Sequence, residues 1–267
     1  MLKALLPQIV SLADKAGHAI MEIYADSAGV VVTKADDSPL TQADLMSDRI
    51  IRAGLDDLGL NFPLLSEELE QAPYVERQSW QHFWLIDPLD GTKEFIQRND
   101  EFTVNIALVE NGVPILGVVY APALDVSYYG ALGVGSFVRR GDGRTELIEV
   151  KPYVEGEPLK VVLSRSHADD RTRKFLDTLG GHECTSMGSS LKICLVAEGK
   201  AHLYPRLGPT MEWDTAAAQA VLSFAGGKIQ DREGRQLKYN KPDLRNVEFF
   251  VHCEHEVLSK TIYAFKD

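Results

Sequence analysis

The pair Asn111-Gly112 constrains the fold of this chain more than any other short feature of its sequence. It separates two apolar runs, residues 102–110 and 113–120. A two-residue turn of this composition adopts the positive φ angles that join antiparallel strands. Two further strands are predicted downstream, at residues 126–131 and 136–140. The first half of the chain is therefore expected to form an antiparallel sheet.

Helical periodicity appears in the sequence both before and after the residues of this predicted sheet. Apolar residues at helical spacing predict an amphipathic helix over residues 7–24, with Pro7 in its first turn, and a second helix over residues 41–58. Beyond a polar boundary at residues 152–158, strands and helices alternate. Those strands are predicted at 160–163, 201–204, near 228 and at 247–251, and the helices at 169–179, 190–198, 215–224 and from 256. We expect one layered unit with an antiparallel lobe, 1–152, and a more α/β-like lobe, 153–267.

The charge of the chain narrows its possible partners. Lys and Arg number 28 against 39 Asp and Glu, a net charge of −11. This balance argues against binding a nucleic-acid polymer. A small anionic substrate is still possible, because bound metal ions can invert the local field.

Cysteine content and hydropathy bear on the compartment. The 3 cysteines show no paired or zinc-binding spacing, so we expect small buried hydrophobes in a reducing, cytoplasmic compartment. Residues 1–7 lack the apolar run of a signal peptide. No stretch of about 18 apolar residues predicts a transmembrane helix.

The main chemical signal lies at residues 84–92, Trp-Leu-Ile-Asp-Pro-Leu-Asp-Gly-Thr. A wholly apolar strand ends in Asp87, and Asp90 follows after three residues. Pro88 fixes one φ angle and Gly91 permits a tight turn, so both carboxylates can point at one place. Oxygen ligands of this kind suit Mg²⁺, and the N–H groups of Gly91 and Thr92 can receive a phosphate. The alternative is an ordinary surface turn.

Three other acidic positions could contribute to the same site. Glu67 follows a predicted strand at 64–66, with a solvated acidic patch as the alternative. Asp214 opens an alanine-rich helix that it could simply cap. Asp44 forms a capping box with Thr41, which does not prevent it from facing a site. The structural alternative is the better one for Glu67 and for Asp214 taken singly, but the match of both together with the 84–92 segment favours a metal site.

The chemistry of phosphate-monoester hydrolysis asks for such a set of carboxylates. The uncatalysed reaction is among the slowest known and requires acceleration of up to ~10²¹-fold. Two metal ions about 3.5–4 Å apart can stabilise the entering and leaving oxygens of an in-line displacement. A nearby carboxylate and hydroxyl then suffice to position a water molecule. No serine or cysteine nucleophile is needed.

These segments resemble the signatures of the inositol monophosphatase superfamily over nearly the whole chain. The resemblance rests on residues 84–92 with Phe95, on Glu67 and on Trp213-Asp214. Within the superfamily, the chain is most similar to the bacterial 3′(2′),5′-bisphosphate nucleotidases. The segments that indicate this subgroup are Lys34, 36–41, 93–96, 164–167, 188–192, 204–206 and 212–214. Ala218 departs from the family, which often has Gly there.

The resemblance implies a layered α-β-α-β-α sandwich and a cytoplasmic enzyme with two or three Mg²⁺ ions. Its substrate would be adenosine 3′(2′),5′-bisphosphate, converted to AMP and phosphate in sulfur metabolism. Peripheral association with the inner face of the cell membrane is also implied. The sequence does not predict an oligomeric state.

The resemblance also implies roles for individual residues. The metal ligands would be Glu67, Asp87, the Leu89 carbonyl, Asp90 and Asp214. Asp44 and Thr92 would orient the attacking water, with Glu67 as the third catalytic residue. The substrate would contact Glu67, Leu89, Asp90, Gly91, Thr92, His167, Ser189, Lys192, Arg206 and Asp214.

Alternatives remain open at two of these positions and for the function. His167 is equally well explained as a loop residue without a role, and Lys192 as part of a solvated helix face. Arg206 is the better candidate, because a guanidinium matches phosphate geometry. One rival function is an inositol- or sugar-phosphate phosphatase of the same fold. Another is a nucleotide-binding protein without catalysis, which the intact carboxylate set argues against.

Overall fold

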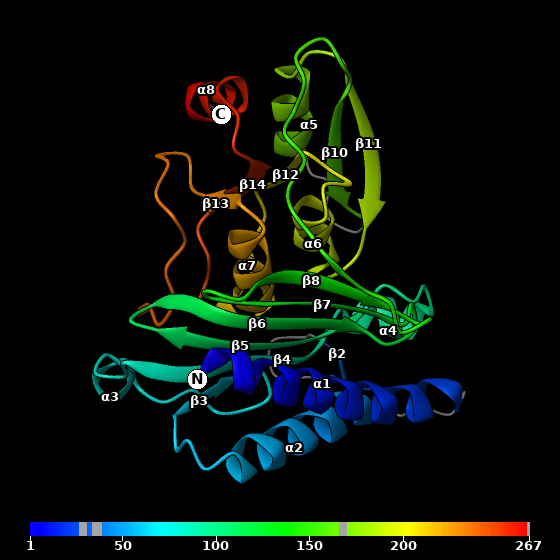
Figure 1. Cartoon of the computed structure of the whole chain (residues 1–267), viewed down its shortest axis with the longest axis vertical. Helices are drawn as coiled ribbons and strands as arrows, with labels where there is room; N and C mark the ends of the chain where they lie inside the picture. Colours follow the sequence, from blue (N-terminus) through cyan, green and yellow to red (C-terminus); the bar gives the residue numbers. More distant parts are fainter. Residues whose placement is uncertain (27–30, 34–38, 166–169, 266–267) are drawn as a thin grey trace.

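The computed structural model describes residues 1–26, 31–33, 39–165 and 170–265, and it has five layers (Figure 1). The first layer holds the two long helices α1 (Leu2–Ala25) and α2 (Gln42–Asp57), which pack against each other and under the large sheet. A short antiparallel pair, β1 (Val31–Thr33) and β2 (Pro39–Thr41), precedes α2. Pro7 lies inside α1, not in its first turn as predicted. Leu5 and Leu6 are buried, and this apolar contact explains why the helix starts earlier.

The second layer is a seven-stranded sheet with the order β3-β4-β5-β6-β7-β8-β9. All neighbours are antiparallel except β3 and β4, which are parallel. Its strands are β3 (Leu64–Ser66), β4 (His82–Asp90), β5 (Thr103–Glu110), β6 (Val113–Ala121), β7 (Val126–Ala131), β8 (Gly135–Arg140) and β9 (Thr145–Leu147). The predicted hairpin is confirmed, since Asn111 and Gly112 join β5 to β6 with φ angles of 50° and 74°. Two short helices, α3 (Tyr74–Arg77) and α4 (Thr92–Gln97), flank β4 in the chain.

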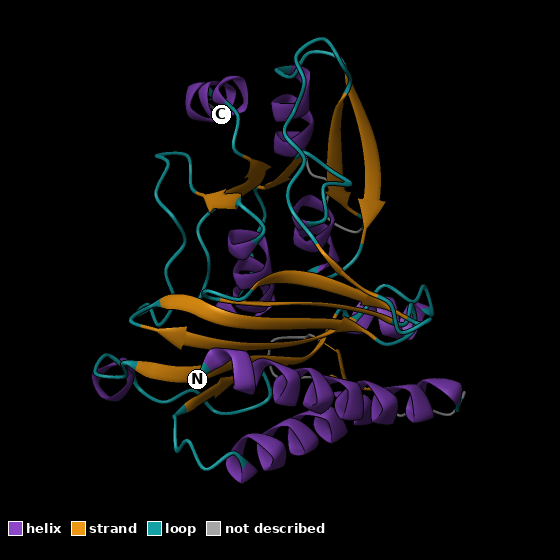
Figure 2. Ribbon diagram, viewed as in Figure 1, coloured by secondary structure: helices purple, strands orange, loops and turns teal. Residues whose placement is uncertain are grey.

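The third layer contains α6 (Leu191–Ala197) and α7 (Glu212–Phe224), and α7 lies between the two sheets (Figure 2). The backbone of α7 touches β6 directly, because a Cβ added at Gly117 would come 2.1 Å from the Ala217 carbonyl oxygen. Ala218 is fully buried in this helix. The side chains around α7 form one hydrophobic core with residues of both sheets. The segment that carries Asp214 is therefore held between the two predicted lobes.

The fourth layer is a five-stranded mixed sheet, and two helices cover its outer face as the fifth layer. The strand order is β11-β10-β12-β14-β13, with β10 parallel to both of its neighbours. These elements are β10 (Leu159–Ser164), β11 (His182–Met187), β12 (Leu203–Arg206), β13 (Gly227–Gln230), β14 (Phe249–Cys253), α5 (Asp170–Asp177) and α8 (Glu256–Ala264). The layered α-β-α-β-α architecture is thus as predicted.

Two details concern the expectations on cysteines and membrane segments. Cys194 and Cys253 are buried, but Cys184 is exposed on β11, so the expectation that all three are buried was wrong for one. The strand β11 lies at the edge of its sheet, where one face is open to solvent. Among the described residues, no helix combines the length and apolarity needed to span a membrane.

Candidate active site

The parallel pair β3 and β4 brings the first two acidic side chains together. Glu67 directly follows β3, and its backbone N–H donates to the Ile86 carbonyl at 3.3 Å, beside Asp87. The pairing of β4 with β5 shifts register between Asp87 and Asp90. The Leu89 N–H donates to Asp87 Oδ1 at 3.1 Å and closes the turn. This irregular strand end directs Asp87 and Asp90 into one cavity.

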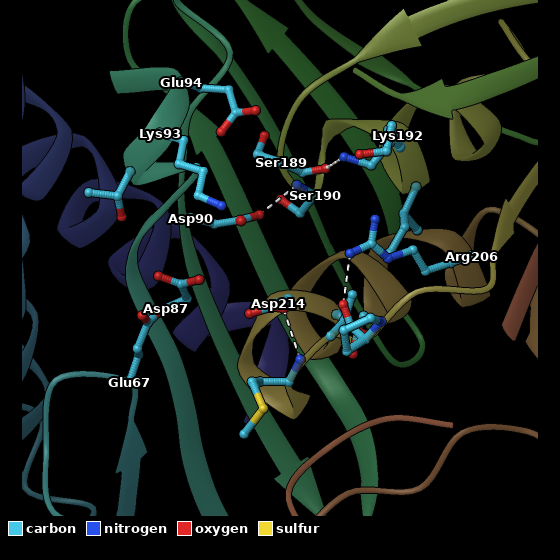
Figure 3. Close-up of a pocket in the computed structure, with 18 of the residues that line it drawn as sticks. Glu67, Asp87, Asp90, Lys93, Glu94, Ser189, Ser190, Lys192, Arg206 and Asp214 are labelled. Atoms are coloured by element: carbon cyan, nitrogen blue, oxygen red, sulfur yellow. Dashed lines mark hydrogen bonds between the residues drawn. The ribbon is translucent and has the colours of Figure 1, made fainter. Parts of the chain in front are cut away.

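Asp214 reaches the same place from the first turn of α7. Its Oδ2 accepts the Met211 N–H at 2.9 Å, so the helix-capping role is real. Carboxylate oxygens of Glu67, Asp87 and Asp214 nevertheless lie within 4.8 Å of one another. Figure 3 shows the three side chains converging from three separate segments. Capping and membership of an acidic cluster therefore coexist in Asp214.

Asp90 occupies a neighbouring position and is not part of this closest group. Its Oδ2 accepts the Ser190 N–H at 2.6 Å and the Asn105 amide at 3.4 Å. Ser190 in turn bonds the Asn105 and Thr103 side chains. Asp90 is thus held between β5 and the start of α6, on the wall of the cavity (Figure 3).

The electrostatics of these carboxylates favour a bound cation. Burial raises the pKa of Asp87 well above its usual range, and the negative charge of Glu67 adds to this. Burial also raises the pKa of Asp90 to about 6 and that of Asp214 well above its usual range. A divalent cation would offset several buried negative charges at once, and carboxylate oxygens are the ligands that Mg²⁺ prefers. The donor set therefore fits Mg²⁺.

Asp44 and Thr92 meet beside the acidic cluster. Asp44 Oδ2 accepts both the N–H and the hydroxyl of Thr41, at 2.8 and 2.5 Å, which confirms the capping box of α2. Asp44 Oδ1 accepts the Thr92 hydroxyl at 3.3 Å. Gly91 precedes Thr92 with φ of 93°, a conformation that glycine adopts without strain. The N-terminus of α2 thus fixes the hydroxyl of Thr92.

The helix α2 supports the cluster through two further contacts. The Ser47 hydroxyl donates to the Pro88 carbonyl at 2.7 Å, within the turn between Asp87 and Asp90. The Ser66 hydroxyl donates to Asp48 Oδ1 at 2.8 Å, next to Glu67. Both serines are fully buried. One face of α2 therefore holds the two segments that carry the acidic side chains Glu67, Asp87 and Asp90.

The opposite wall of the cavity is basic (Figure 3). Lys192 is only 6% exposed, so the solvated-face alternative is excluded. Its ammonium donates to the Ser189 carbonyl and lies 5.6 Å from the centre of the Tyr204 ring. Burial lowers the pKa of Lys192 to about 8. Arg206, on β12, donates to the Pro209 carbonyl at 2.7 Å.

Two buried polar atoms on this basic wall lack partners within the described part of the chain. They are the Ser189 hydroxyl and Arg206 Nε. Ser189 also has a positive φ of 46°, which is unusual for serine. Unsatisfied buried donors are rare in folded proteins. An anionic ligand in the cavity could satisfy them.

The cavity has a volume of about 570 Å³ and joins the two walls. Of the predicted site residues that the structure describes, Asp44 alone does not line the cavity, and it accepts a hydrogen bond from the lining residue Thr92. His167 lies outside the described residues, as do Lys34 and residues 36–38. Sequence reasoning gave no role to the cations Lys93 and Arg245, which also line the cavity. Lys93 adjoins Thr92 and could have been suspected, whereas no local pattern marks Arg245.

Comparison with known proteins shows to which protein family this chain belongs. The family model of the inositol monophosphatase family matches residues 1–262. The chain belongs to the inositol monophosphatase family. The resemblance found in the sequence is thereby confirmed.

Individual relatives show which members of this family the chain resembles. The 3′(2′),5′-bisphosphate nucleotidase CysQ of Shigella flexneri is 51% identical over 236 residues, covering 88% of this chain and 94% of that protein. The Haemophilus influenzae protein of the same name is 35% identical and covers 98% of this chain and 97% of its own. Among solved structures, CysQ from Bacteroides thetaiotaomicron has 41% identity and a TM-score of 0.80, covering 92% and 95% of the two chains. The suhB protein of Bartonella henselae superposes with a TM-score of 0.81 at 25% identity, covering 98% and 99%.

Proposed function

We propose that this protein is a Mg²⁺-dependent phosphatase that hydrolyses adenosine 3′(2′),5′-bisphosphate to AMP and phosphate. The observation that carries the proposal is one cavity with two unlike walls, a carboxylate cluster and a pair of buried cations. A substrate with two phosphate groups matches both walls at once. The names of the CysQ relatives support the same substrate. A role in sulfur metabolism in the cytoplasm is proposed on the same grounds.

The carboxylate wall would hold the metal. Glu67, Asp87 and Asp214 form the closest set, and Asp90 with the Leu89 carbonyl extends it along the turn. We assign two or three Mg²⁺ ions to these ligands. When bound, Mg²⁺ would neutralise charge on the phosphate being removed and lower the pKa of a nearby water.

The attacking water would be positioned by the pair Thr92 and Asp44. The Thr92 hydroxyl lines the cavity and lies 3.3 Å from Asp44 Oδ1 and 3.4 Å from the Leu89 carbonyl oxygen, so it can donate to the protein and accept from a water. Asp44 is buried and capped by Thr41, so it can keep the hydroxyl in one orientation. A fixed acceptor of this kind aligns a water proton and orients the oxygen for in-line attack.

The basic wall would hold the phosphate that is not removed. Lys192 and Arg206 are both more than nine-tenths buried, so their charges are weakly screened by solvent. Arg206 Nε and the Ser189 hydroxyl supply donors that have no partner among the described residues. Gly91 and Thr92 present backbone N–H groups at the start of α4, on the metal side. His167 remains a predicted nucleotide contact.

The decisive assay measures phosphate release from adenosine 3′,5′-bisphosphate and from inositol 1-phosphate, each with and without Mg²⁺. We expect Mg²⁺-dependent turnover with a clear preference for the nucleotide. A preference for inositol 1-phosphate would favour the sugar-phosphate rival. Binding of the nucleotide without turnover at any Mg²⁺ concentration would favour the silent binding protein.

A further inference from the structure

A buried carboxylate that does not line the cavity stands close in sequence to Asp214, a member of the acidic cluster. Glu212 is 0% exposed and stands in the first turn of α7, two residues before Asp214. It accepts the Lys241 ammonium at 2.6 Å and the backbone N–H groups of Lys241 and Asn240 at 3.0 and 2.6 Å. Both of its oxygens are therefore occupied, and the start of α7 is tied to the loop that follows Tyr239.

The same loop is held from its other side by a buried arginine. Arg77, in α3, is 3% exposed and donates to the Asn240 side chain and to the Lys241 and Pro242 carbonyls, at 2.9, 2.5 and 2.9 Å. The Asn240 amide returns a bond to the Arg77 carbonyl at 2.5 Å. A guanidinium offers five donors in a rigid fork, so this clamp leaves the loop little freedom.

Arg77 also connects to the segment that carries Glu67. Its Nε donates to the Ala72 carbonyl at 3.2 Å. The Gln71 amide donates to the Ser66 carbonyl at 2.5 Å, and this contact folds the chain back onto the end of β3, next to Glu67. Hydrogen bonds, together with the peptide bond between Gln71 and Ala72, thus connect the segment around Glu67 through Arg77 and the loop at 240–242 to Glu212.

Further hydrogen bonds hold this loop against the N-terminus of α7. The Glu212 N–H donates to the Leu244 carbonyl at 2.9 Å, and the Asn246 N–H donates to the Thr210 carbonyl at 2.8 Å. The Asn246 amide also donates to the Met211 carbonyl at 2.7 Å. Met211 is the residue whose N–H is capped by Asp214. The backbone on which Asp214 stands is therefore fixed by the same loop that Arg77 clamps.

We infer that Glu212 is a positioning residue for the metal site and that its network with Lys241 and Arg77 sets the spacing between Glu67 and Asp214. Glu67 follows β3 and Asp214 lies in α7, so the two carboxylates come from segments that are remote in the sequence. Their oxygens must nonetheless stay within one coordination sphere. Loss of contacts that orient metal ligands typically weakens metal binding by about 10- to 100-fold. The inference rests on the proposed function for the identity of the cation.

The experiment uses the full chain and follows thermal unfolding during a Mg²⁺ titration, so that its readout does not depend on turnover. Metal that binds only the folded state stabilises it by RT ln(1 + [Mg²⁺]/Kd), so the rise in Tm at a given Mg²⁺ concentration reports the Kd. In Glu212→Gln, we expect the Mg²⁺ concentration that gives a fixed rise in Tm to increase roughly tenfold. Lys241→Met removes the ammonium but leaves both backbone donors, so a smaller increase in the same direction is expected.

Glu198→Gln is the matched control. Glu198 is a buried carboxylate that accepts the Tyr128 hydroxyl at 2.7 Å and the Lys200 ammonium at 3.0 Å, and it does not line the cavity. We expect it to lower Tm in chelator while leaving the Mg²⁺ dependence unchanged. The two variants thus separate lost stability from lost metal affinity.

Each outcome bears on one claim. If the wild-type protein shows no Mg²⁺-dependent rise in Tm, the proposed metal site fails. If the wild type responds but Glu212→Gln keeps the same Mg²⁺ dependence, the positioning role is overturned and Glu212 only stabilises the fold. An equal change in Glu198→Gln would overturn it too. Should Glu212→Gln not fold, Lys241→Met decides by the same criterion.

Discussion

Asp90→Asn should make the metal-free protein more stable and the enzyme inactive. Burial raises the pKa of Asp90 from 3.8 to about 6, and the charge of Lys192 and the Ser190 N–H only partly oppose this. The ionised carboxylate therefore destabilises the fold above pH 6 when no cation is present. An amide has nearly the same shape as the carboxyl group and cannot ionise. The substitution therefore removes the free-energy cost of a buried negative charge and keeps an acceptor for the Ser190 N–H.

The size of the effect follows from the pKa. A shift of about 2 units corresponds to about 3 kcal/mol, and partial exposure of Asp90 reduces this to about 1–3 kcal/mol. For a chain of this length, 1 kcal/mol moves Tm by roughly 2–4 °C. We expect Tm in chelator to rise by several degrees above pH 6. The gain should vanish below the unfolded-state pKa of 3.8, where both states are protonated.

Thermal unfolding in chelator and in Mg²⁺, combined with phosphate release, measures both halves of this prediction. With Mg²⁺, the variant should lose the metal-induced rise in Tm and its turnover, because one anionic ligand is gone. Asp142→Asn is the control, since hydrogen bonds from Arg144 lower the pKa of that exposed carboxyl. Near-normal turnover of Asp90→Asn at low Mg²⁺ would reduce Asp90 to a turn residue. A lower Tm in chelator would refute the argument from burial.

Three further predictions concern the substrate. Arg206→Ala and Lys192→Ala should each raise KM for adenosine 3′,5′-bisphosphate about ten- to hundredfold, because a charge-assisted hydrogen bond contributes roughly 1.5–3 kcal/mol. KM for a simple phosphate monoester should change much less, and equal losses on both substrates would mean that these side chains do not bind the second phosphate. Because burial lowers the pKa of Lys192 to about 8, its ammonium is lost as pH rises through 8. KM for the bisphosphate should therefore rise as pH passes through 8. The rise should be smaller in Lys192→Arg, which stays charged. A wild-type KM that is constant over this pH interval would contradict phosphate binding by Lys192. Thr92→Ala should lower kcat about a hundredfold on either substrate with little change in KM, and Thr92→Ser should restore it; a kcat unaffected by Thr92→Ala would remove Thr92 from the mechanism.

The acidic cluster could be predicted because each of its members lies close to the end of a local element. Asp87 lies near the end of β4, Glu67 follows β3, and Asp214 lies in the first turn of α7. For Asp214 and Asp44 the alternative interpretation was a helix cap, and the structure shows that both side chains do make capping hydrogen bonds. A single carboxylate serves both purposes, because one oxygen can cap a helix while the other faces the site.

The supporting contacts could not be predicted because their partners are remote in the sequence. Arg77 and Asn240 are separated by 163 positions, and nothing in either segment indicates the other. The helix α7 begins at Glu212, three residues before the predicted start at Thr215, since the apolar alanine run hides a polar first turn. The edge strand β11 was missed because its residues are mostly polar and exposed. Tertiary contacts decide all three cases.

A net charge of −11 should repel an anionic substrate. The cavity overcomes this repulsion because it has an acidic wall and a separate basic wall. Buried carboxylates alone would repel a phosphate, so the acidic wall can receive one only together with a cation. The basic wall carries its own buried charges, Lys192 and Arg206, and needs no metal to attract a second phosphate. Under the proposed function, affinity for the bisphosphate and its turnover therefore originate on opposite walls. Substitutions on the basic wall should act mainly on KM, and those at Asp90 or Thr92 mainly on kcat and the response to Mg²⁺.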